Sequence, residues 1–200
     1  TPETLDMVVV RENTEGEYSG AGGFFKWGWP EGFATQTGYF TQKGCERVMR
    51  YAFDLARERK KLKGGEGDEV GMVTNCTKSN ALNYSMVFWD SVYNQVAKDY
   101  PDIKQDMALV DAITMWFVKN PHYFDVVVAS NLFGDIITDL GAMIQGGMGF
   151  AAGANLNPEK EYPSMFEPIH GSAPKYTGRA IVNPVATIES VRMMLEHMDE

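Results

Sequence analysis

The chain has 200 residues, of which 44% are hydrophobic, and this is enough apolar material for one or two domains with a buried core. Its formal net charge of −9 argues against a nucleic-acid or anionic-membrane partner. No apolar run approaches the length of a membrane-spanning helix, no signal peptide is visible, and the two cysteines lack metal-binding spacing. We therefore expect a reduced, cytoplasmic protein, and the start at Thr1 without a methionine leads us to expect a missing upstream segment.

The first predicted element is a strand over residues 5–10, followed by the polar cluster Arg11-Glu-Asn-Thr-Glu-Gly-Glu-Tyr18. Polar residues that follow the end of a buried strand are well placed to meet a ligand. Arg11 offers a fork of donors that fits a carboxylate, and the Tyr18 hydroxyl can donate or accept a proton. For this segment alone, an exposed loop with a structural arginine is the alternative.

Residues 19–41 are rich in glycine and aromatic side chains and lack a helical period. They predict two short strands joined around residues 30–32, which form a projecting ribbon. An isolated ribbon is marginal in water, and its aromatic side chains would be costly to expose. We therefore expect the ribbon to pair with a second copy of the chain.

Residues 42–61 predict an amphipathic helix with a basic last turn. Its apolar face would carry Val48, Tyr51, Ala52 and Leu55. A strand over residues 70–74 follows, and Lys78 then lies at the turn into a long helix that extends to about residue 100. A lysine at such a turn can take part in proton transfer, although a surface lysine is the more common case.

A short strand over residues 107–110 leads directly into Asp111 and an apolar helix that ends at Pro121. The Asp111 carboxylate either caps this helix or supplies a third ligand to a metal ion held by Asp135 and Asp139.

Residues 125–139 contain the strongest candidates for a metal-binding site in the sequence. Residues 126–129 predict a strand buried on both faces, and the polar side chains that follow predict a helix start. Asp135 and Asp139 are one helical turn apart, which would put two carboxylates roughly 5–6 Å apart on one face. A solvated helix face is the alternative, but ligands bind at strand–helix junctions of open α/β sheets, and a hard cation, Mg²⁺ or Mn²⁺, would suit the pair.

A glycine-rich run over residues 146–153 contains the outline of a dinucleotide fingerprint, but it follows a helix instead of a strand. We interpret it as close backbone packing. Residues 166–176 predict a loop with many donors, and Asn183-Pro184 leads into a final helix. The loop contains His170, Gly171, Ser172, Ala173, Pro174, Lys175 and Tyr176. It could hold a nucleotide, although a single loop histidine is usually not catalytic.

Five motifs in chain order carry a resemblance to a known family. They are Arg11–Tyr18, Thr77-Lys-Ser-Asn80, Val110-Asp-Ala112, Asn131-Leu-Phe-Gly-Asp-Ile-Ile-Thr-Asp139, and His170-Gly-Ser-Ala-Pro174 with Asn183-Pro184. The chain closely resembles the β-decarboxylating dehydrogenases, the family of isocitrate, 3-isopropylmalate, D-malate and tartrate dehydrogenases. The resemblance implies an α/β fold of two domains with mixed sheets, distinct from a classical Rossmann fold, and a fragment that lacks the family's N-terminal and C-terminal parts.

The resemblance also implies the role of each domain and of each site residue. Residues 1–124 would form a small substrate and dimerisation domain with the ribbon as a projecting arm, and residues 125–200 part of the large domain. Arg11 would hold the malate-type carboxylate, and Tyr18 and Lys78 would be the acid–base pair. The implied metal ligands are Asp111, Asp135 and Asp139. The implied cofactor-binding residues are His170 to Tyr176 and Asn183.

In this family the lysine and the first aspartate come from the partner subunit, so each site would be shared across a homodimer. The implied reaction is the metal-dependent oxidative decarboxylation of a 2-hydroxy acid, with hydride transfer to NAD or NADP. Residues 124–135, 155–158 and 163–168 look more like the D-malate and tartrate branch than like other branches. Isocitrate or 3-isopropylmalate dehydrogenase is the alternative, as is a catalytically silent regulatory subunit, although none of the acid–base and metal residues is missing.

The residue after Pro174 is informative about whether the cofactor is NAD or NADP. Relatives that use NAD typically carry an aspartate there, which accepts from the ribose 2′-hydroxyl, whereas this chain has Lys175-Tyr176, as NADP-dependent isocitrate dehydrogenases do. A lysine cannot accept that hydrogen bond, but it would pair with a 2′-phosphate. The resemblance therefore favours NADP modestly.

Overall fold

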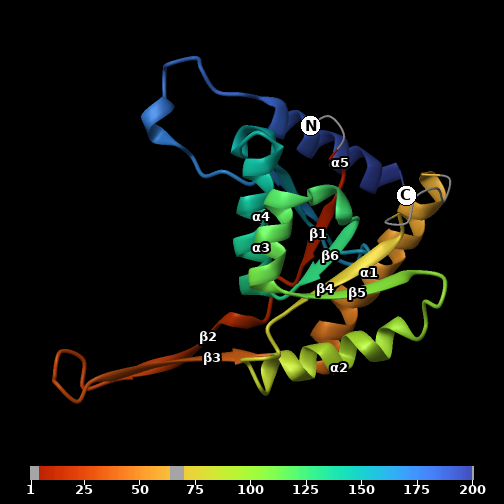
Figure 1. Cartoon of the computed structure of the whole chain (residues 1–200). Helices are drawn as coiled ribbons and strands as arrows, with labels where there is room; N and C mark the ends of the chain where they lie inside the picture. The colour runs from red at the N-terminus through yellow and green to blue at the C-terminus, as the bar shows by residue number, and fades with distance from the viewer. Residues whose placement is uncertain (1–4, 64–69, 200) are drawn as a thin grey trace. The chain divides into compact units, whose positions relative to one another are not determined.

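The computed structural model describes residues 5–63 and 70–199, and Figure 1 traces them along the chain. The chain forms two compact units, of which the larger holds residues 6–137 and the smaller holds residues 138–199 together with Leu5. The boundary between them lies inside helix α4 (Asn131–Gln145). Residues 125–137 thus pack with the part of the chain that precedes them. The division into a substrate and dimerisation domain and a large domain, which the resemblance implies, stays a prediction.

A four-stranded parallel sheet forms the core of the larger unit. Its strands lie in the order β1 (Val8–Arg11), β6 (Val126–Ala129), β4 (Met72–Thr77) and β5 (Lys104–Leu109). All residues of β4 and β6 are buried, as expected for central strands with both faces covered. The four strands predicted from the sequence are confirmed, with bounds shifted by at most three residues.

Helix α1 (Gln42–Leu62) begins at Thr41, whose hydroxyl accepts a hydrogen bond from Gly44 N at 3.0 Å. The predicted apolar face is partly wrong, because Tyr51 and Leu55 are only half-buried. The buried face contains Cys45, Val48, Met49, Ala52, Phe53 and Ala56. Phe53 stacks on Tyr100 with 4.9 Å between the ring centroids, which explains why this face turns inward.

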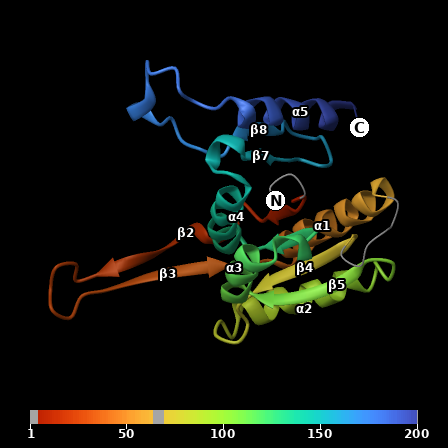
Figure 2. The same ribbon diagram turned by 45° about the horizontal axis from the view of Figure 1, so that its top comes forward.

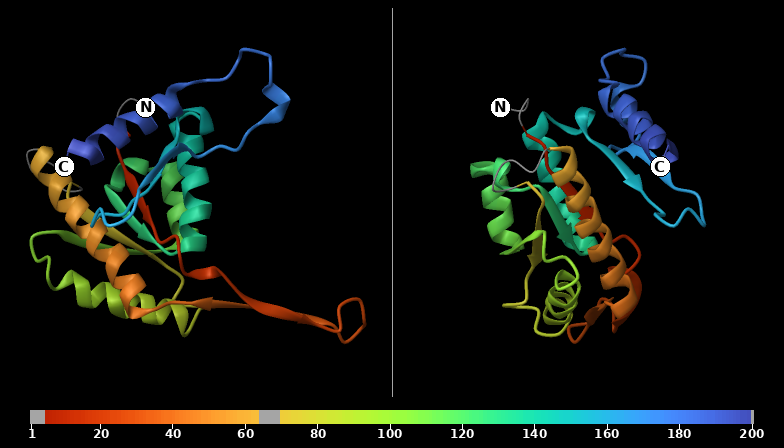
Figure 3. Two further views of the ribbon diagram at one scale, coloured as in Figure 1. Left: turned by 180° about the vertical axis from the view of Figure 1, so that it is seen from behind. Right: turned by 90° about the vertical axis from the view of Figure 1, so that its right-hand side faces the viewer.

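Helix α2 (Ser85–Ala97) is shorter than predicted, but its predicted packing stripe of Trp89, Val92, Tyr93 and Val96 is buried. It packs against α1. Helix α3 (Val110–Lys119) contacts β4 and β5 and lies on the opposite face of the sheet from α1 (Figure 3). The larger unit is therefore a sheet covered by helices on both faces.

The predicted ribbon is confirmed as the antiparallel pair β2 (Gly16–Phe25) and β3 (Phe33–Tyr39). It projects from the larger unit, as Figures 1 and 2 show. Its aromatic side chains are exposed, with Trp27 at 73% and Trp29 at 69%. Phe24 and Trp27 contact each other edge to face, with ring centroids 4.3 Å apart, but most of their surface meets no other part of the described chain.

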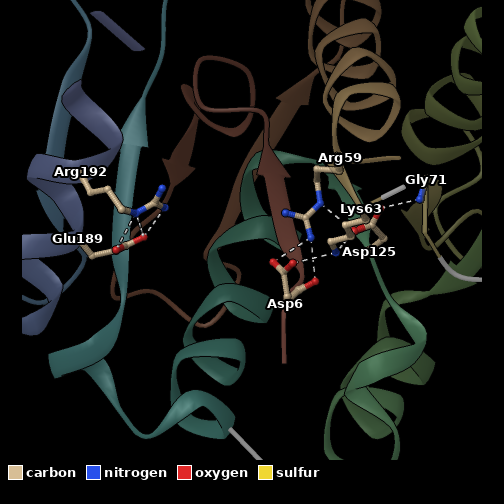
Figure 4. Close-up of polar contacts among 7 residues, drawn as sticks. All are labelled: Asp6, Arg59, Lys63, Gly71, Asp125, Glu189 and Arg192. Atoms are coloured by element: carbon tan, nitrogen blue, oxygen red, sulfur yellow. Dashed lines mark hydrogen bonds and ion pairs between the residues drawn. The ribbon is translucent and has the colours of Figure 1, made fainter. Parts of the chain in front are cut away.

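An ion-pair network joins α1 to the amino-terminal edge of the sheet (Figure 4). The side chain of Asp125 is 3% exposed, and its Oδ1 accepts from Arg59 Nε at 2.8 Å and from Lys63 Nζ at 3.2 Å. Its Oδ2 accepts from Gly71 N at 2.8 Å, and Asp6 Oδ1 lies 2.9 Å from Arg59 Nη2. Because Asp6, Gly71 and Asp125 precede three strands, the network anchors the edge opposite to the one described below.

The smaller unit contains the antiparallel hairpin β7 (Ala152–Asn155) and β8 (Met165–Pro168), against which α5 (Val185–Asp199) packs (Figure 2). Residues 166–168 are therefore strand, where the sequence predicted loop. The glycine-rich run does pack closely, since a Cβ on Gly153 would lie 3.0 Å from Ile169 Cγ2. Within the two described ranges, no helix combines the length and apolarity that crossing a membrane requires.

Candidate active site

Four of the predicted site residues lie at or just beyond the carboxyl ends of the parallel strands. Arg11 ends β1, Lys78 follows β4, Asp111 comes two residues after β5, and Asp135 lies in the helix after β6. Parallel strands present their carboxyl ends at one edge of the sheet, and this is where open α/β sheets bind ligands. The fold thus brings these distant residues to one edge.

The first cluster consists of Arg11, Tyr18 and Asp135. Arg11 Nη1 lies 2.8 Å from Asp135 Oδ1, and the Tyr18 hydroxyl donates to Asp135 Oδ2 at 3.1 Å. The hydrogen bond to Asp135 raises the pKa of Tyr18, because it favours the protonated phenol beside a carboxylate. Tyr18 is 53% exposed, so a ligand can reach its hydroxyl from solvent. The cluster offers a carboxylate-binding fork, a proton donor and an anionic oxygen ligand together.

The second cluster is the pair of Lys78 and Asp111. Lys78 Nζ lies 2.5 Å from Asp111 Oδ1. The hydrogen bond from Lys78 lowers the pKa of the Asp111 carboxyl, so this aspartate is ionised at neutral pH. Asp111 is at the start of α3, as the sequence predicted, but its side chain bonds to the lysine across the strand ends.

The carboxylates at this edge have the oxygen chemistry that Mg²⁺ and Mn²⁺ prefer. Within residues 5–63 and 70–199, however, no three His, Cys, Asp or Glu side chains come close enough together to hold a metal ion. Asp139 is exposed, one turn beyond Asp135 in α4, and Asp111 is paired with Lys78. The donors fit a hard cation, but one chain presents them as two partial sets.

The predicted nucleotide-binding loop lies between β8 and α5 in the smaller unit and is mostly exposed. Ala173 has a left-handed backbone with φ of 43° and precedes the short helix η4 (Pro174–Tyr176). Lys175 Nζ lies 4.8 Å from the centroid of the Tyr176 ring. Asn183 Oδ1 accepts from Val185 N at 3.0 Å at the start of α5. The roles of these residues in cofactor binding stay predictions.

The sequence profile described as isocitrate/isopropylmalate dehydrogenase matches residues 1–200. The chain belongs to the isocitrate/isopropylmalate dehydrogenase family. This confirms the resemblance that the five motifs carry, and the α/β fold with mixed sheets that it implies.

Relatives within the isocitrate/isopropylmalate dehydrogenase family have different names. The chain is 51% identical to "3-isopropylmalate dehydrogenase" of Thermobifida fusca, over 98% of this chain and 53% of the relative. It is 47% identical to "Probable tartrate dehydrogenase/decarboxylase" of Bacillus subtilis, over 100% and 53%. It is also 47% identical to "D-malate dehydrogenase [decarboxylating]" of Escherichia coli, over 98% and 52%. The chain thus spans about half the length of these curated relatives.

A solved structure of isocitrate dehydrogenase from Methylococcus capsulatus has the same fold. Its similarity reaches a TM-score of 0.85 at 42% identity, over 96% of this chain and 53% of that one. This agreement extends over nearly all elements of the chain.

Sequence reasoning missed several residues that shape this family member's site. Asn131 begins α4, as the sequence predicts, but its side chain also bonds to Arg11, which the sequence does not indicate. Glu12, with a buried carboxylate, accepts from Thr14 N at 2.9 Å and from Glu15 N at 2.8 Å, and so fixes the loop between Arg11 and Tyr18. The acidic positions in the Arg11–Tyr18 motif were a usable signal, because carboxylates often bond to nearby backbone amides.

Proposed function

We propose that this chain forms part of a metal-dependent dehydrogenase that oxidises and decarboxylates a malate-type 2-hydroxy acid, with D-malate or tartrate as the substrate. One observation carries the proposal. At the ligand-binding edge of the sheet, the Arg11 fork lies beside the Tyr18 phenol and the Asp135 carboxylate, which are the groups that this reaction needs. The relatives named as decarboxylating dehydrogenases support it.

Each protein residue has its own task in the proposed reaction. Arg11 binds a substrate carboxylate, because a planar guanidinium offers two parallel donors to it. Lys78, with carboxylate help, would take the proton of the 2-hydroxyl as C2 is oxidised to give a 2-oxo acid. A bound nicotinamide cofactor would supply the hydride acceptor for this oxidation. After carbon dioxide has left C3, Tyr18 gives a proton to that carbon.

Three aspartates would hold the divalent ion of this reaction: Asp135 and Asp139 on α4, and Asp111 beside Lys78. Once bound, Mg²⁺ or Mn²⁺ would act as a Lewis acid toward the substrate oxygens and stabilise the negative charge that develops on them. Because one chain presents these ligands as two partial sets, the proposal requires Asp111 and Lys78 to come from a partner subunit.

A homodimer with shared sites is therefore part of the proposal. Two observations support it: among residues 5–63 and 70–199 no three acidic, histidine or cysteine side chains gather to hold a metal ion, and the ribbon exposes aromatic side chains that a second copy would cover. Exposed aromatic surface of this kind is costly for a protein that stays monomeric.

The identity of the acid is the finest part of the proposal. The motifs around residues 124–135, 155–158 and 163–168 support D-malate or tartrate, and so do the relatives with these names. The 51% identity to a 3-isopropylmalate dehydrogenase supports the competing choice. The hydride acceptor is NAD or NADP, and Lys175 favours NADP because its ammonium would pair with a 2′-phosphate.

The deciding experiment compares substrates in parallel. The purified protein at its full native length is assayed with D-malate, tartrate, isocitrate and 3-isopropylmalate, each with Mn²⁺ and with either NAD or NADP. We expect the highest kcat/KM with D-malate or tartrate, together with carbon dioxide release. A clear preference for isocitrate or 3-isopropylmalate would overturn the choice of substrate, and no turnover of any acid would overturn the proposed function.

A further inference from the structure

Asn131 is a buried polar residue that the proposed reaction does not use. It is 2% exposed, and its Oδ1 accepts from Arg11 Nη2 at 2.8 Å and from Arg11 Nε at 3.2 Å. Its Nδ2 donates to the backbone carbonyl of Glu15 at 3.1 Å. The amide oxygen thus meets donors and the amide nitrogen meets an acceptor, so its orientation is fixed by its partners. Through the two ends of its amide group, Asn131 joins α4 to Arg11 and to Glu15.

The contacts of Asn131 determine which edge of the guanidinium remains for a ligand. They occupy the edge formed by Nε and Nη2 of Arg11. The edge formed by Nη1 and the second hydrogen of Nη2 is then the one that can give a carboxylate two parallel hydrogen bonds. Nη1 of this edge is paired with Asp135 Oδ1 at 2.8 Å in this structure, so a substrate carboxylate that binds here would replace Asp135, the proposed metal ligand, as the partner of Nη1.

Gly134 makes room for the stem of the same arginine. A Cβ at this position would lie 2.5 Å from Arg11 Cγ and 2.8 Å from Arg11 Cβ, too close for any real contact. Glycine inside a helix is unfavourable relative to alanine, so its place in α4 calls for a physical reason. The close approach of Arg11 supplies that reason. Asn131 and Gly134 are three residues apart and therefore lie on one face of the helix.

We propose that Asn131 and Gly134 are positioning residues that set the orientation of the Arg11 guanidinium for the carboxylate of the 2-hydroxy acid. Neither needs to touch the substrate, because both act through Arg11. The inference rests on the proposed function, since Arg11 has this carboxylate to bind only in such a dehydrogenase. It explains why a buried amide and a helical glycine lie directly behind the arginine.

The test is a double-mutant cycle in the purified, Mn²⁺-loaded protein, with the acid that the wild type turns over best. We expect Asn131→Ala to raise KM for the acid about tenfold, the equivalent of about 1.4 kcal/mol, and to leave KM for the cofactor unchanged. In an Arg11→Ala background the same change should have almost no further effect, because its partner is gone. Effects of the two substitutions that add in full would overturn the inference.

Gly134→Ala provides a second variant, which leaves the Asn131 side chain itself unchanged and has the better helix former. We expect it to raise KM for the acid by a similar factor, because Arg11 must move away from the added methyl group. Calorimetric titration with the acid should show the same weakening in Kd. Thermal unfolding, measured in parallel, should show that both variants are folded at the assay temperature.

The outcomes separate the two proposals. If Arg11→Ala raises KM for the acid while Asn131→Ala and Gly134→Ala do not, the positioning role is wrong and the proposed function stands. If Arg11→Ala itself leaves KM and Kd for every acid unchanged, Arg11 does not bind the substrate, and both the site assignment and this inference fail.

Discussion

Lys78 Nζ lies 2.5 Å from Asp111 Oδ1, and this contact joins the carboxyl ends of neighbouring strands β4 and β5. The hydrogen bond from the lysine lowers the pKa of the Asp111 carboxyl, so the aspartate keeps its charge at neutral pH. An ionised aspartate beside a lysine is suited to two tasks, as an anionic metal ligand and as a partner that holds the amine in place.

The proposed base can be tested by keeping its charge and removing its ability to accept a proton. We expect Lys78→Arg to lower kcat by about 10²- to 10⁴-fold, because a guanidinium cannot be deprotonated in a protein. KM for the cofactor should stay unchanged in steady-state assays. Lys119→Arg, at the end of α3, is the matched control and should keep wild-type kcat. A Lys78→Arg protein with normal kcat would show that Lys78 is not the base.

The metal assignment predicts that Asp135→Asn abolishes Mn²⁺-dependent turnover and leaves the protein folded as a dimer. Asparagine has the same shape but lacks the charge that a hard cation requires. Mn²⁺ binding, followed by electron paramagnetic resonance, should weaken together with activity. Asp99→Asn, which removes only an exposed ion pair with Arg50, should leave both unchanged. Metal-dependent activity that survived in Asp135→Asn would show that the site is assigned wrongly.

The parts of the fold that could be predicted from the sequence depend on local patterns. The continuous run of β-branched residues in Val126–Ala129 has few alternatives to a buried strand, and the period of α2 placed Trp89 and Tyr93 correctly in the core. The face of α1 was partly missed, because a helix with apolar residues on several sides can turn either way. The contact between Phe53 and Tyr100, which turns the Phe53 face of α1 inward, joins residues far apart in the chain.

In the candidate site, too, local patterns could be predicted from the sequence and long-range contacts could not. Arg11 and Lys78 could be located because polar residues after a buried strand form a recognisable pattern. The link from Asn131 to Arg11 spans 120 residues, and the sequence offered only a local interpretation of Asn131 as a helix start. Nothing in the sequence says that Glu15 would bond to Thr41 at the start of α1. Long-range polar contacts of this kind follow from the assembled sheet and not from any single segment.

The ion-pair network at the other edge of the sheet predicts a dependence of stability on pH. Burial raises the pKa of Asp6, but the hydrogen bonds from Lys63 and Arg59 lower it by more, so the net shift is downward. A carboxyl with a lowered folded pKa stabilises the protein above its unfolded value of about 3.9, and this stability is lost as the pH falls through the folded pKa.

We therefore expect the free energy of unfolding to decline below about pH 4 and Asp6→Asn to flatten this decline. The effect should be about 1 kcal/mol at most, because Asp6 is largely exposed and solvent screens its charge. Urea unfolding at a series of pH values measures it. An Asp6→Asn protein with the wild-type slope in this pH range would show that Asp6 contributes no such linkage.

The exposed ribbon predicts how the proposed dimer can be weakened. Replacing Phe24 and Trp27 together by serine should shift the protein toward monomer in sedimentation experiments, because the aromatic surface that would be covered by a second copy is lost. Leu62→Ser is the control, since Leu62 is 79% exposed but lies outside the ribbon. An unchanged dimer would show that the ribbon is not part of the subunit interface.

The proposed preference for NADP rests on Lys175, and the strengths of its possible contacts can be compared. Its ammonium lies over the Tyr176 ring at 4.8 Å, an exposed cation–π contact worth about 0.5–1 kcal/mol. A charge-assisted hydrogen bond to a 2′-phosphate is worth roughly 1.5–3 kcal/mol, so the proposed contact with NADP would favour movement of Lys175 away from the ring. An aspartate at this position would repel that phosphate and could accept from the 2′-hydroxyl of NAD instead.

We expect Lys175→Asp to shift the ratio of kcat/KM toward NAD by about tenfold, the equivalent of about 1.4 kcal/mol. Steady-state kinetics with both cofactors measure the ratio. Lys160→Asp, which changes the charge by the same amount between β7 and β8, should leave it unchanged. A wild-type protein that already prefers NAD and a ratio that does not respond to Lys175→Asp would together show that Lys175 does not contact the 2′ position of the cofactor.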